Sequence, residues 1–131
     1  MNQIVSELRK TGIFYIATSD GERACVRPFS SLAEINHKLF LCTANYKDCY
    51  RQLQQNPSLE IAGMLRDGSW LRIRGKAVFT DDREIKRKML EDPSVPPKYS
   101  LDDGVFEVFS VEDMIAEKYL ETGEKIPVLS E

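Results

Sequence analysis

Apolar and polar residues alternate over short stretches of this chain, and the alternation predicts a mostly antiparallel β fold. Asp20-Gly21 and Asp67-Gly68 each stand between two alternating runs, as residues of tight hairpin turns do. A third hairpin is predicted to turn at Asn36-His37-Lys38. The expected strands, about six in all, cover residues 13–19, 23–29 with a continuation over 30–35, 39–43, 59–65, 70–79 and 105–109.

Few helices interrupt this pattern. A short amphipathic helix is predicted over residues 2–10, with Gly12 as its stop, and a second one over residues 46–55, ended by Asn56-Pro57. A third, charged helix begins after a cap at Thr80 or Asp81 and ends at Glu91. Together the elements predict a mainly β (α+β) fold, a closed or nearly closed antiparallel barrel in one domain over residues 1–131.

The C-terminal segment, residues 111–131, leaves two interpretations open. Ser110 with Asp113 resembles a helix capping box, and Met114, Ile115 and Leu120 suit one face of a helix. The same residues suit an extension of the preceding strand equally well.

Charge and cysteine content narrow the class of protein. The 18 Lys and Arg residues are interleaved with 21 Asp and Glu residues, which does not suit a nucleic-acid-binding surface. No apolar run approaches the ~18 residues of a membrane span, and the N-terminus does not resemble a signal peptide. Cys25, Cys42 and Cys49 are odd in number and form no CxxC pair, as expected of free thiols in the cytoplasm.

Several catalytic signatures do not occur in the sequence. It contains no GxSxG elbow, no glycine-rich phosphate loop and no HExxH motif. Its one histidine, His37, falls at the predicted hairpin tip, so neither a nucleophile–histidine pair nor a protein-built metal site is expected. Any chemistry is therefore expected from a bound cofactor.

A candidate anion site lies where a predicted strand passes into the second helix, in the run Thr43-Ala44-Asn45-Tyr46-Lys47. The backbone N–H groups of a first helical turn have no partner within the helix, and the positive helix end attracts anions. Thr43 adds a hydroxyl and Lys47 a cation. The same spacing also fits a capped helix that binds nothing.

A second candidate segment, Arg27-Pro28-Phe29-Ser30, ends the strand over 23–29. Arg27 and Phe29 share one face of that strand, and Pro28, which has no N–H group, marks a sheet edge that a ligand can reach. Cys25 shares the face, which leaves two interpretations, a residue near the bound cofactor or a small core residue, and the second is preferred. A guanidinium, an aromatic ring and a phosphate site together predict a phosphorylated aromatic cofactor.

From Phe14 to Phe109, about three-quarters of the chain, the sequence resembles the pyridoxamine 5′-phosphate oxidase-like, FMN-binding split-barrel family, in particular its short bacterial, nitroimidazole-resistance-like members. Four pieces carry the resemblance, in the family's order: FYIATSDGERACVRPF, LFLCTANYKDCYRQLQQNP, LEIAGM and DGSWLRIRGKAVF. The resemblance implies a six-stranded antiparallel split barrel with a few flanking helices.

It also implies a cofactor site for FMN. In such a site Arg27, Pro28, Phe29 and Ser30 contact the ring and ribityl chain, and Thr43, Asn45 and Lys47 hold the phosphate. Trp70 is implied to reach the flavin from the other chain of a homodimer. Its alternative role is structural, in the barrel or the dimer interface.

The implied function is that of an FMN-dependent oxidoreductase. A nicotinamide donor would reduce the flavin, which would pass electrons to a small electron-poor substrate of unknown identity. The alternative is a flavin- or haem-binding module that stores, senses or carries its ligand without turnover. The chain lacks the C-terminal Trp and Arg residues with which true pyridoxamine phosphate oxidases hold their substrate, so that specific reaction is not expected.

Overall fold

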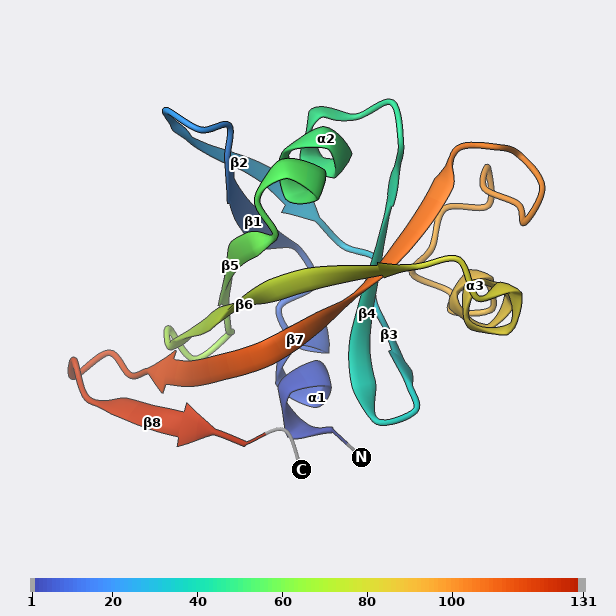
Figure 1. Ribbon diagram of the computed structural model, residues 1–131. Helices are drawn as coiled ribbons and strands as arrows, with labels where there is room; N and C mark the ends of the chain where they lie inside the picture. Colours follow the sequence, from blue (N-terminus) through green and yellow to red (C-terminus); the bar gives the residue numbers. More distant parts are fainter. Residues whose placement is uncertain (1, 130–131) are drawn as a thin grey trace.

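Hairpins build most of the antiparallel sheet that dominates this structure (Figure 1). The computed structural model describes residues 2–129. Within them the elements are α1 (Gln3–Arg9), β1 (Phe14–Ser19), β2 (Ala24–Phe29), β3 (Ala33–Ile35), β4 (Lys38–Ala44), α2 (Asp48–Gln55), β5 (Ser58–Met64), β6 (Trp70–Thr80), α3 (Arg83–Leu90), β7 (Phe106–Tyr119) and β8 (Lys125–Val128).

The strands lie in the order β2-β1-β5-β6-β7-β4-β3, and β8 pairs with β7 beside this path. Strands β2 and β3 stand at its two ends, and residues 30–32 carry the chain from one to the other. The sheet is therefore open between β2 and β3. This architecture confirms the predicted antiparallel fold class, although the described residues form eight strands and not six.

Residues 111–119 and 125–128 of the C-terminal segment are strand, which resolves the ambiguity in the sequence pattern for them, and residues 130–131 lie outside the described part of the chain. β7 pairs with β4 through residues 106–110 and with β6 through residues 108–119, and β8 pairs with the last part of β7. Ser110, a candidate helix cap, lies inside β7 and donates its hydroxyl proton to the Glu112 carboxylate instead. The ladder with β6 satisfies the backbone groups that a helix would have paired internally.

Gly75 allows β6 and β7 to stay paired around an irregularity in the ladder. Their register shifts between Arg74 and Lys76, and Asp113 opposite has a φ of +53°. A Cβ atom at Gly75 would stand 2.8 Å from the carbonyl oxygen of Glu112, closer than a side chain tolerates. Only glycine admits this close approach of the two backbones.

Two apolar clusters form the core, and β4 contributes to both. Leu39 and Leu41 face the cluster inside the coiled sheet, which also holds Phe14, Ile16 and Phe109. Phe40 and Cys42 face the other cluster, packed beneath α3. β4 is thus buried on both faces for most of its length, which a strictly alternating strand would not be.

The three helices begin in different ways. The side chain of Asn2 accepts hydrogen bonds from the N–H groups of Ile4 and Val5 and so caps α1. Asp82, and neither Thr80 nor Asp81 as predicted, caps α3. No side chain caps α2, whose first residue follows Lys47. In Figure 1, α2 lies near β1 and β2, on the side of the molecule where the sheet is open.

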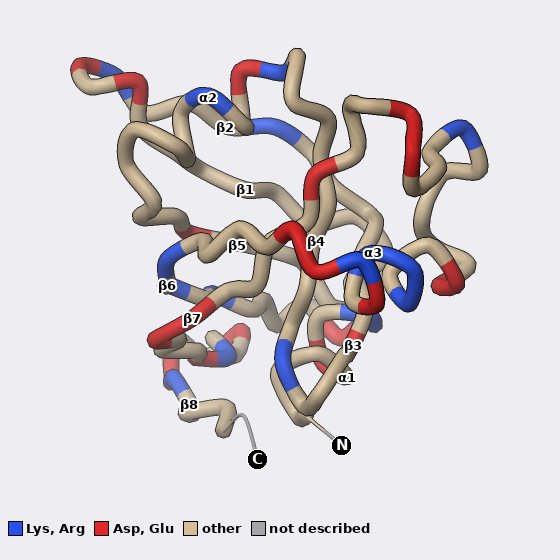
Figure 2. Tube along the Cα trace, turned by 45° about the vertical axis from the view of Figure 1, so that its right-hand side comes forward, with Lys and Arg blue, Asp and Glu red and all other residues tan. Residues whose placement is uncertain are grey.

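Charged residues of both signs are distributed along the whole described trace (Figure 2). Asn36 and His37 both have positive φ angles at the β3–β4 turn, which confirms the predicted hairpin tip. Among residues 2–129, no helix is long and apolar enough to cross a membrane.

Candidate functional site

A groove of about 840 Å³ opens where the sheet does not close. Residues 25–31, from β2 and the connection that follows it, form one wall. The end of β4 and the start of α2 form the floor, and Pro96 and Tyr99 of the loop after α3 form the opposite wall. Its size is that of a site for a cofactor or drug-sized ligand.

The β2 wall presents backbone as well as side chains to the groove. β2 pairs with β1 on one side only, and consecutive residues from Cys25 to Ser31 line the groove. Successive side chains of a strand point to opposite faces, so a ligand that meets all of them meets the free backbone edge. Pro28, on that edge, contributes a carbonyl oxygen but no N–H group.

The floor of the groove is a helix start without a protein cap. Lys47 is the N-cap residue of α2, its side chain makes no capping hydrogen bond, and it lines the groove together with Asp48 and Cys49. The N–H groups of the first turn of α2 therefore have no partner within the helix. Their partial positive charge and the Lys47 ammonium both favour an anion here.

The Thr43 hydroxyl adds an independent sign of a missing ligand. Its residue is 3% exposed, its Oγ1 atom has no hydrogen-bond partner among the described residues, and it lines the groove beside α2. A buried hydroxyl without a partner costs about 1–3 kcal/mol, so native structures rarely leave one. A ligand oxygen or a water molecule in the groove would satisfy it.

The guanidinium of Arg27 reaches from β2 toward α2. It donates to the hydroxyl of Thr18 (2.7 Å), the side-chain oxygen of Gln52 (2.8 Å) and the carbonyl oxygen of Ile16 (3.3 Å). Phe29, two residues along the same face, packs against Phe14 with 6.3 Å between ring centroids. The strand therefore places a fixed cation and an aromatic ring on one side of the groove, as the sequence predicted.

Serine hydroxyls fasten the opposite wall to the connection between β2 and β3. The hydroxyl of Ser31 donates to the carbonyl oxygen of Ser94 (2.8 Å), and the Ser94 hydroxyl donates to the carbonyl oxygen of Leu32 (3.0 Å). This attachment fixes the loop that carries Pro96 and Tyr99. The Tyr99 ring packs on Phe106 with 5.2 Å between centroids, and burial raises the pKa of its hydroxyl.

All three cysteines are free and line the groove. Burial raises the pKa of the Cys42 thiol from its ordinary 9.0 to about 11. Burial also raises the pKa of the Cys49 thiol, and the charges of Arg27 and Lys47 oppose that rise. Cys25 is half-buried at the groove wall and is not the core residue that the sequence pattern suggested.

The structure brings together six of the eight site residues named from the sequence. They line the groove and are Arg27, Pro28, Phe29, Ser30, Thr43 and Lys47.

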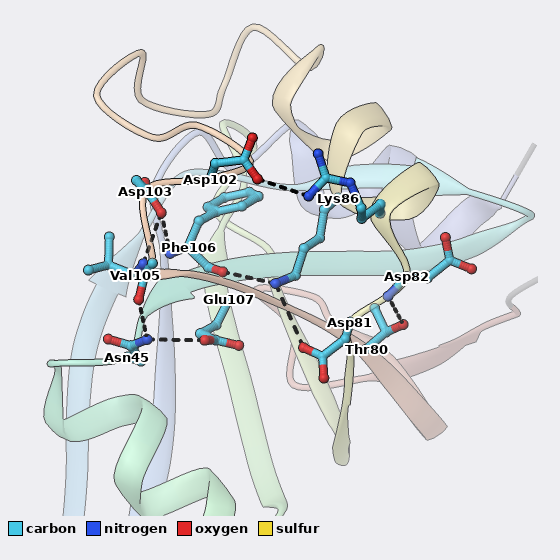
Figure 3. A network of polar contacts seen from close by, with 12 residues as sticks. Asn45, Thr80, Asp81, Asp82, Lys86, Asp102, Asp103, Val105, Phe106 and Glu107 are labelled. Carbon is cyan, nitrogen blue, oxygen red and sulfur yellow. Dashed lines mark hydrogen bonds and ion pairs between the residues drawn. The ribbon is translucent and has the colours of Figure 1, made fainter.

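Asn45 does not line the groove. Its side-chain amide donates to the carbonyl oxygen of Gly104 (2.9 Å) and to the Glu107 carboxylate (3.2 Å), and so ties the turn after β4 to the start of β7 (Figure 3). In the same view, Lys86 donates to the carbonyl oxygen of Phe106 and faces Asp81. The polar residues of this network serve to attach α3 and the β7 start to the sheet.

Trp70 does not line the groove of its own chain either. It begins β6 and stacks on Tyr119 of β7, with 4.4 Å between ring centroids and 12° between ring planes. Met64 of β5 pairs with it across the sheet and is 61% exposed. Trp70 thus stands on the outer sheet face, among exposed apolar side chains.

Sequence reasoning missed several groove residues, chiefly Gln52, Cys42, Cys49 and Tyr99. Gln52 lies on the buried side of α2 with Cys49 and Leu53, so a polar residue within that apolar stripe was an available signal. Tyr99 sits in a proline-rich loop whose path no local pattern predicts. Among residues 2–129, no three His, Cys, Asp or Glu side chains form a metal-binding cluster.

Comparison with known proteins identifies close structural relatives. No protein-family model and no curated protein sequence matches this chain. A NimC/NimA family protein from Clostridium acetobutylicum has 36% sequence identity and a TM-score of 0.90, covering 95% of this chain and 88% of that one.

More distant structures share the fold. A pyridoxamine 5′-phosphate oxidase-related, FMN-binding protein from Nostoc punctiforme has 14% identity and a TM-score of 0.59, covering 93% of this chain and 88% of that one. A haem-binding protein from Mycobacterium smegmatis has 17% identity and a TM-score of 0.76, covering 98% of this chain but 55% of that one.

The raised pKa of Cys42 predicts that stability falls at alkaline pH. In the unfolded chain this thiol loses its proton near pH 9, whereas in the folded chain it keeps the proton to about pH 11. The unfolded state therefore binds fewer protons between these values, and the free energy of unfolding falls as pH rises through them, by about 2 kcal/mol in all. Below pH 9 the contribution of this thiol is fully present.

Urea unfolding at pH 8, 9, 10 and 11 measures this effect. The Cys42→Ala variant should lose less stability over this range than the wild type, and Cys25→Ala, which removes a half-buried thiol, should follow the wild type. Parallel pH curves for the wild type and Cys42→Ala would contradict the prediction.

Proposed function

The chain belongs to the NimC/NimA family, and from this premise we propose that it binds FMN in the groove and acts as an FMN-dependent oxidoreductase. The observation that carries the proposal is the buried Thr43 hydroxyl, which lacks a partner beside the uncapped, positive start of α2. A phosphate monoester supplies the acceptor oxygens and the negative charge that this end of the groove lacks. The resemblance to an FMN-binding fold neighbour supports the choice of flavin.

The residues present fit FMN at both of its ends. Thr43, Lys47 and the first-turn amides of α2 would hold the phosphate. Arg27, which the family resemblance places at the ring and ribityl chain, is bonded to Gln52 of α2 and would be a second cation for the phosphate. Phe29, Ser30 and the free edge of β2 would hold the ring and its side chain. A flavin ring carries carbonyl and N–H groups along one edge, which suit the alternating backbone groups of an unpaired strand. Asn45, occupied by Gly104 and Glu107, is left out of the proposed site.

The protein supplies binding and electrostatics in this proposal, and the bound flavin supplies the electron transfer. The groove contains no histidine, and the thiols of Cys42 and Cys49 have raised pKa values, so no acid–base pair is assigned. Arg27 and Lys47 place positive charge beside the ligand. Positive charge near a flavin favours its reduced, more negative form.

Haem storage or transport is the second candidate, since one fold neighbour is a haem-binding protein. A haem iron takes its axial ligand from His, Cys thiolate, Met or Tyr. His37, the one histidine of the chain, lies exposed at the β3–β4 hairpin tip and does not line the groove. The two buried thiols are protonated at neutral pH. Tyr46 and Tyr99 line the groove, but Tyr46 is mostly exposed and the Tyr99 ring packs on Phe106 with a raised pKa. A flavin is preferred here because the uncapped start of α2 suits its phosphate.

A homodimer completes the proposed site. Tyr15, Val26, Met64 and Ile115 are each at least half exposed on strands of the sheet, and Met64 pairs with the stacked Trp70. A second copy packed on these strands would cover the apolar side chains and bring one chain's Trp70 to the other's open groove. Each flavin would then contact both protomers.

The first test is reduction of the bound cofactor. Purified protein loaded with FMN should be yellow, and NADH or NADPH should bleach the flavin band under anaerobic conditions. A nitroaromatic or similar electron-poor compound should then restore the colour. Tight FMN binding without reduction by either nucleotide would favour the non-catalytic carrier, and the absence of any flavin binding would remove the proposal.

The proposed phosphate site predicts that the Lys47→Ala variant loses affinity for FMN but not for riboflavin. Removal of one charge-assisted hydrogen bond, about 1.5–3 kcal/mol, should weaken FMN binding roughly ten- to a hundredfold and leave riboflavin binding nearly unchanged. Titration of both ligands measures the effect. Lys10→Ala, which removes a cation from the end of α1 away from the groove, is the matched control. Equal losses for the two ligands would show that Lys47 does not hold the phosphate.

The dimer predicts a spectroscopic change in the Trp70→Ala variant. An indole ring stacked on a flavin quenches its emission, so bound FMN should brighten in the variant. Its affinity should fall modestly, by about 1 kcal/mol as for an aromatic pair. Tyr119→Phe keeps the aromatic stack and should behave as the wild type. Sedimentation of a monomer that still holds one FMN per chain would contradict the shared site.

A further inference from the structure

A closed network of three polar side chains lies in the groove wall, between β1, β2 and α2. The Thr18 hydroxyl donates to the Gln52 side-chain oxygen, and the Arg27 guanidinium donates to both (2.7 and 2.8 Å). Thr18 and Gln52 are each 5% exposed. Two almost fully buried polar side chains thus hold one arginine at the edge of the groove.

Every acceptor that holds Arg27 is neutral. They are a hydroxyl, an amide oxygen and the carbonyl oxygen of Ile16, and Arg27 forms no ion pair with any carboxylate of the described residues. A partly buried cation without a counter-charge is costly, and the cost is met when an anion arrives. The groove is the side from which such an anion can come, because Arg27 and Gln52 both line it.

The network lies next to the anion-binding start of α2. Gln52 follows Cys49 by three residues on the same buried side of the helix. The charges of Arg27 and Lys47 both act on the Cys49 thiol and oppose the rise of its pKa. Both cations therefore lie against α2 beside the groove, Arg27 from β2 through its hydrogen bond to Gln52 and Lys47 as the N-cap residue.

The residue type at position 52 decides whether the Arg27 charge is available. Glutamate at this position would accept the same hydrogen bonds in nearly the same volume, but its negative charge would neutralise the guanidinium. Glutamine holds Arg27 equally well and leaves its charge for a ligand.

We propose that Gln52, supported by Thr18, is a positioning residue that directs Arg27 at the groove and leaves its charge without a counter-charge, and so determines the preference for a phosphorylated over an unphosphorylated flavin. The inference rests on the proposed function, because the ligand it discriminates is FMN. It adds a specificity determinant that acts through another residue.

Four proteins test the role of Gln52: the wild type, Gln52→Glu, Gln52→Met and Gln54→Glu. Gln54 is exposed on the same helix, so Gln54→Glu makes the same charge change without touching Arg27. Titration with FMN and with riboflavin measures the ratio of their dissociation constants. Gln52→Glu should weaken FMN binding at least tenfold and change riboflavin binding less than threefold, and Gln54→Glu should leave both within threefold.

The Gln52→Met variant separates the effect of the direction of the Arg27 side chain from the effect of a charge at position 52. It keeps the size of the side chain but removes the acceptor, so Arg27 stays charged and loses its fixed direction. FMN binding should weaken, though less than in Gln52→Glu. The inference would be overturned if Gln52→Glu kept the wild-type ratio of the two dissociation constants, or if it lost affinity for FMN and for riboflavin equally.

Inorganic phosphate, added to the flavin-free protein, distinguishes a failure of this inference from a failure of the proposed function. At equal ionic strength, phosphate in place of chloride should raise the melting temperature of the wild type and of Gln54→Glu but not of Gln52→Glu. If this pattern appears while no variant binds flavin, the flavin proposal fails, and the role of Gln52 in directing Arg27 at a bound anion stands. Equal stabilisation of the wild type and Gln52→Glu, or of neither, would overturn the inference.

Discussion

The unpaired outer edge of β2 is the constraint from which the site follows. The sheet coils through seven strands and stops, with β2 at one end and β3 at the other. Backbone N–H and C=O groups along such an edge must be satisfied by water or by a ligand. The gap becomes a groove because α2 forms its floor and the loop after α3 forms its far wall. The absence of one strand pairing is therefore the origin of the binding surface.

The groove carries two cations, and neutral hydrogen-bond acceptors hold the one on its wall. Lys47 and the start of α2 bring charge to the floor, and Arg27 brings it to the wall, where only neutral acceptors hold it. Thr43 contributes a buried hydroxyl that no described residue satisfies. In the proposed function, a bound anion would satisfy both features, so one set of residues would account for affinity and for selectivity. The electron chemistry would belong to the flavin.

The fold alone does not decide which cofactor is bound. A haem-binding protein with 17% identity shares it with a TM-score of 0.76, and an FMN-binding protein with 14% identity shares it with a TM-score of 0.59. The distinction lies in side chains of the groove. Here, the start of α2, which no side chain caps, lines the groove together with Lys47, and the one histidine of the chain stands outside the groove on a hairpin turn.

Local pattern was enough to predict the hairpins at Asp20-Gly21 and Asp67-Gly68 and the three helices, since turn and helix signals act between near neighbours in the chain. Six of the residues that line the groove were also named from the sequence. Tertiary structure decided the rest. Residues 111–119 suited helix or strand, and only the ladder with β6 made them strand. Asn45 looked like a ligand residue, but Gly104 and Glu107, far along the chain, occupy its amide. Gln52 accepts hydrogen bonds from Thr18 and Arg27 because β1 and β2 place these two residues against α2. Such pairings depend on which distant segments pack together, and the spacing of residues within one segment does not predict them.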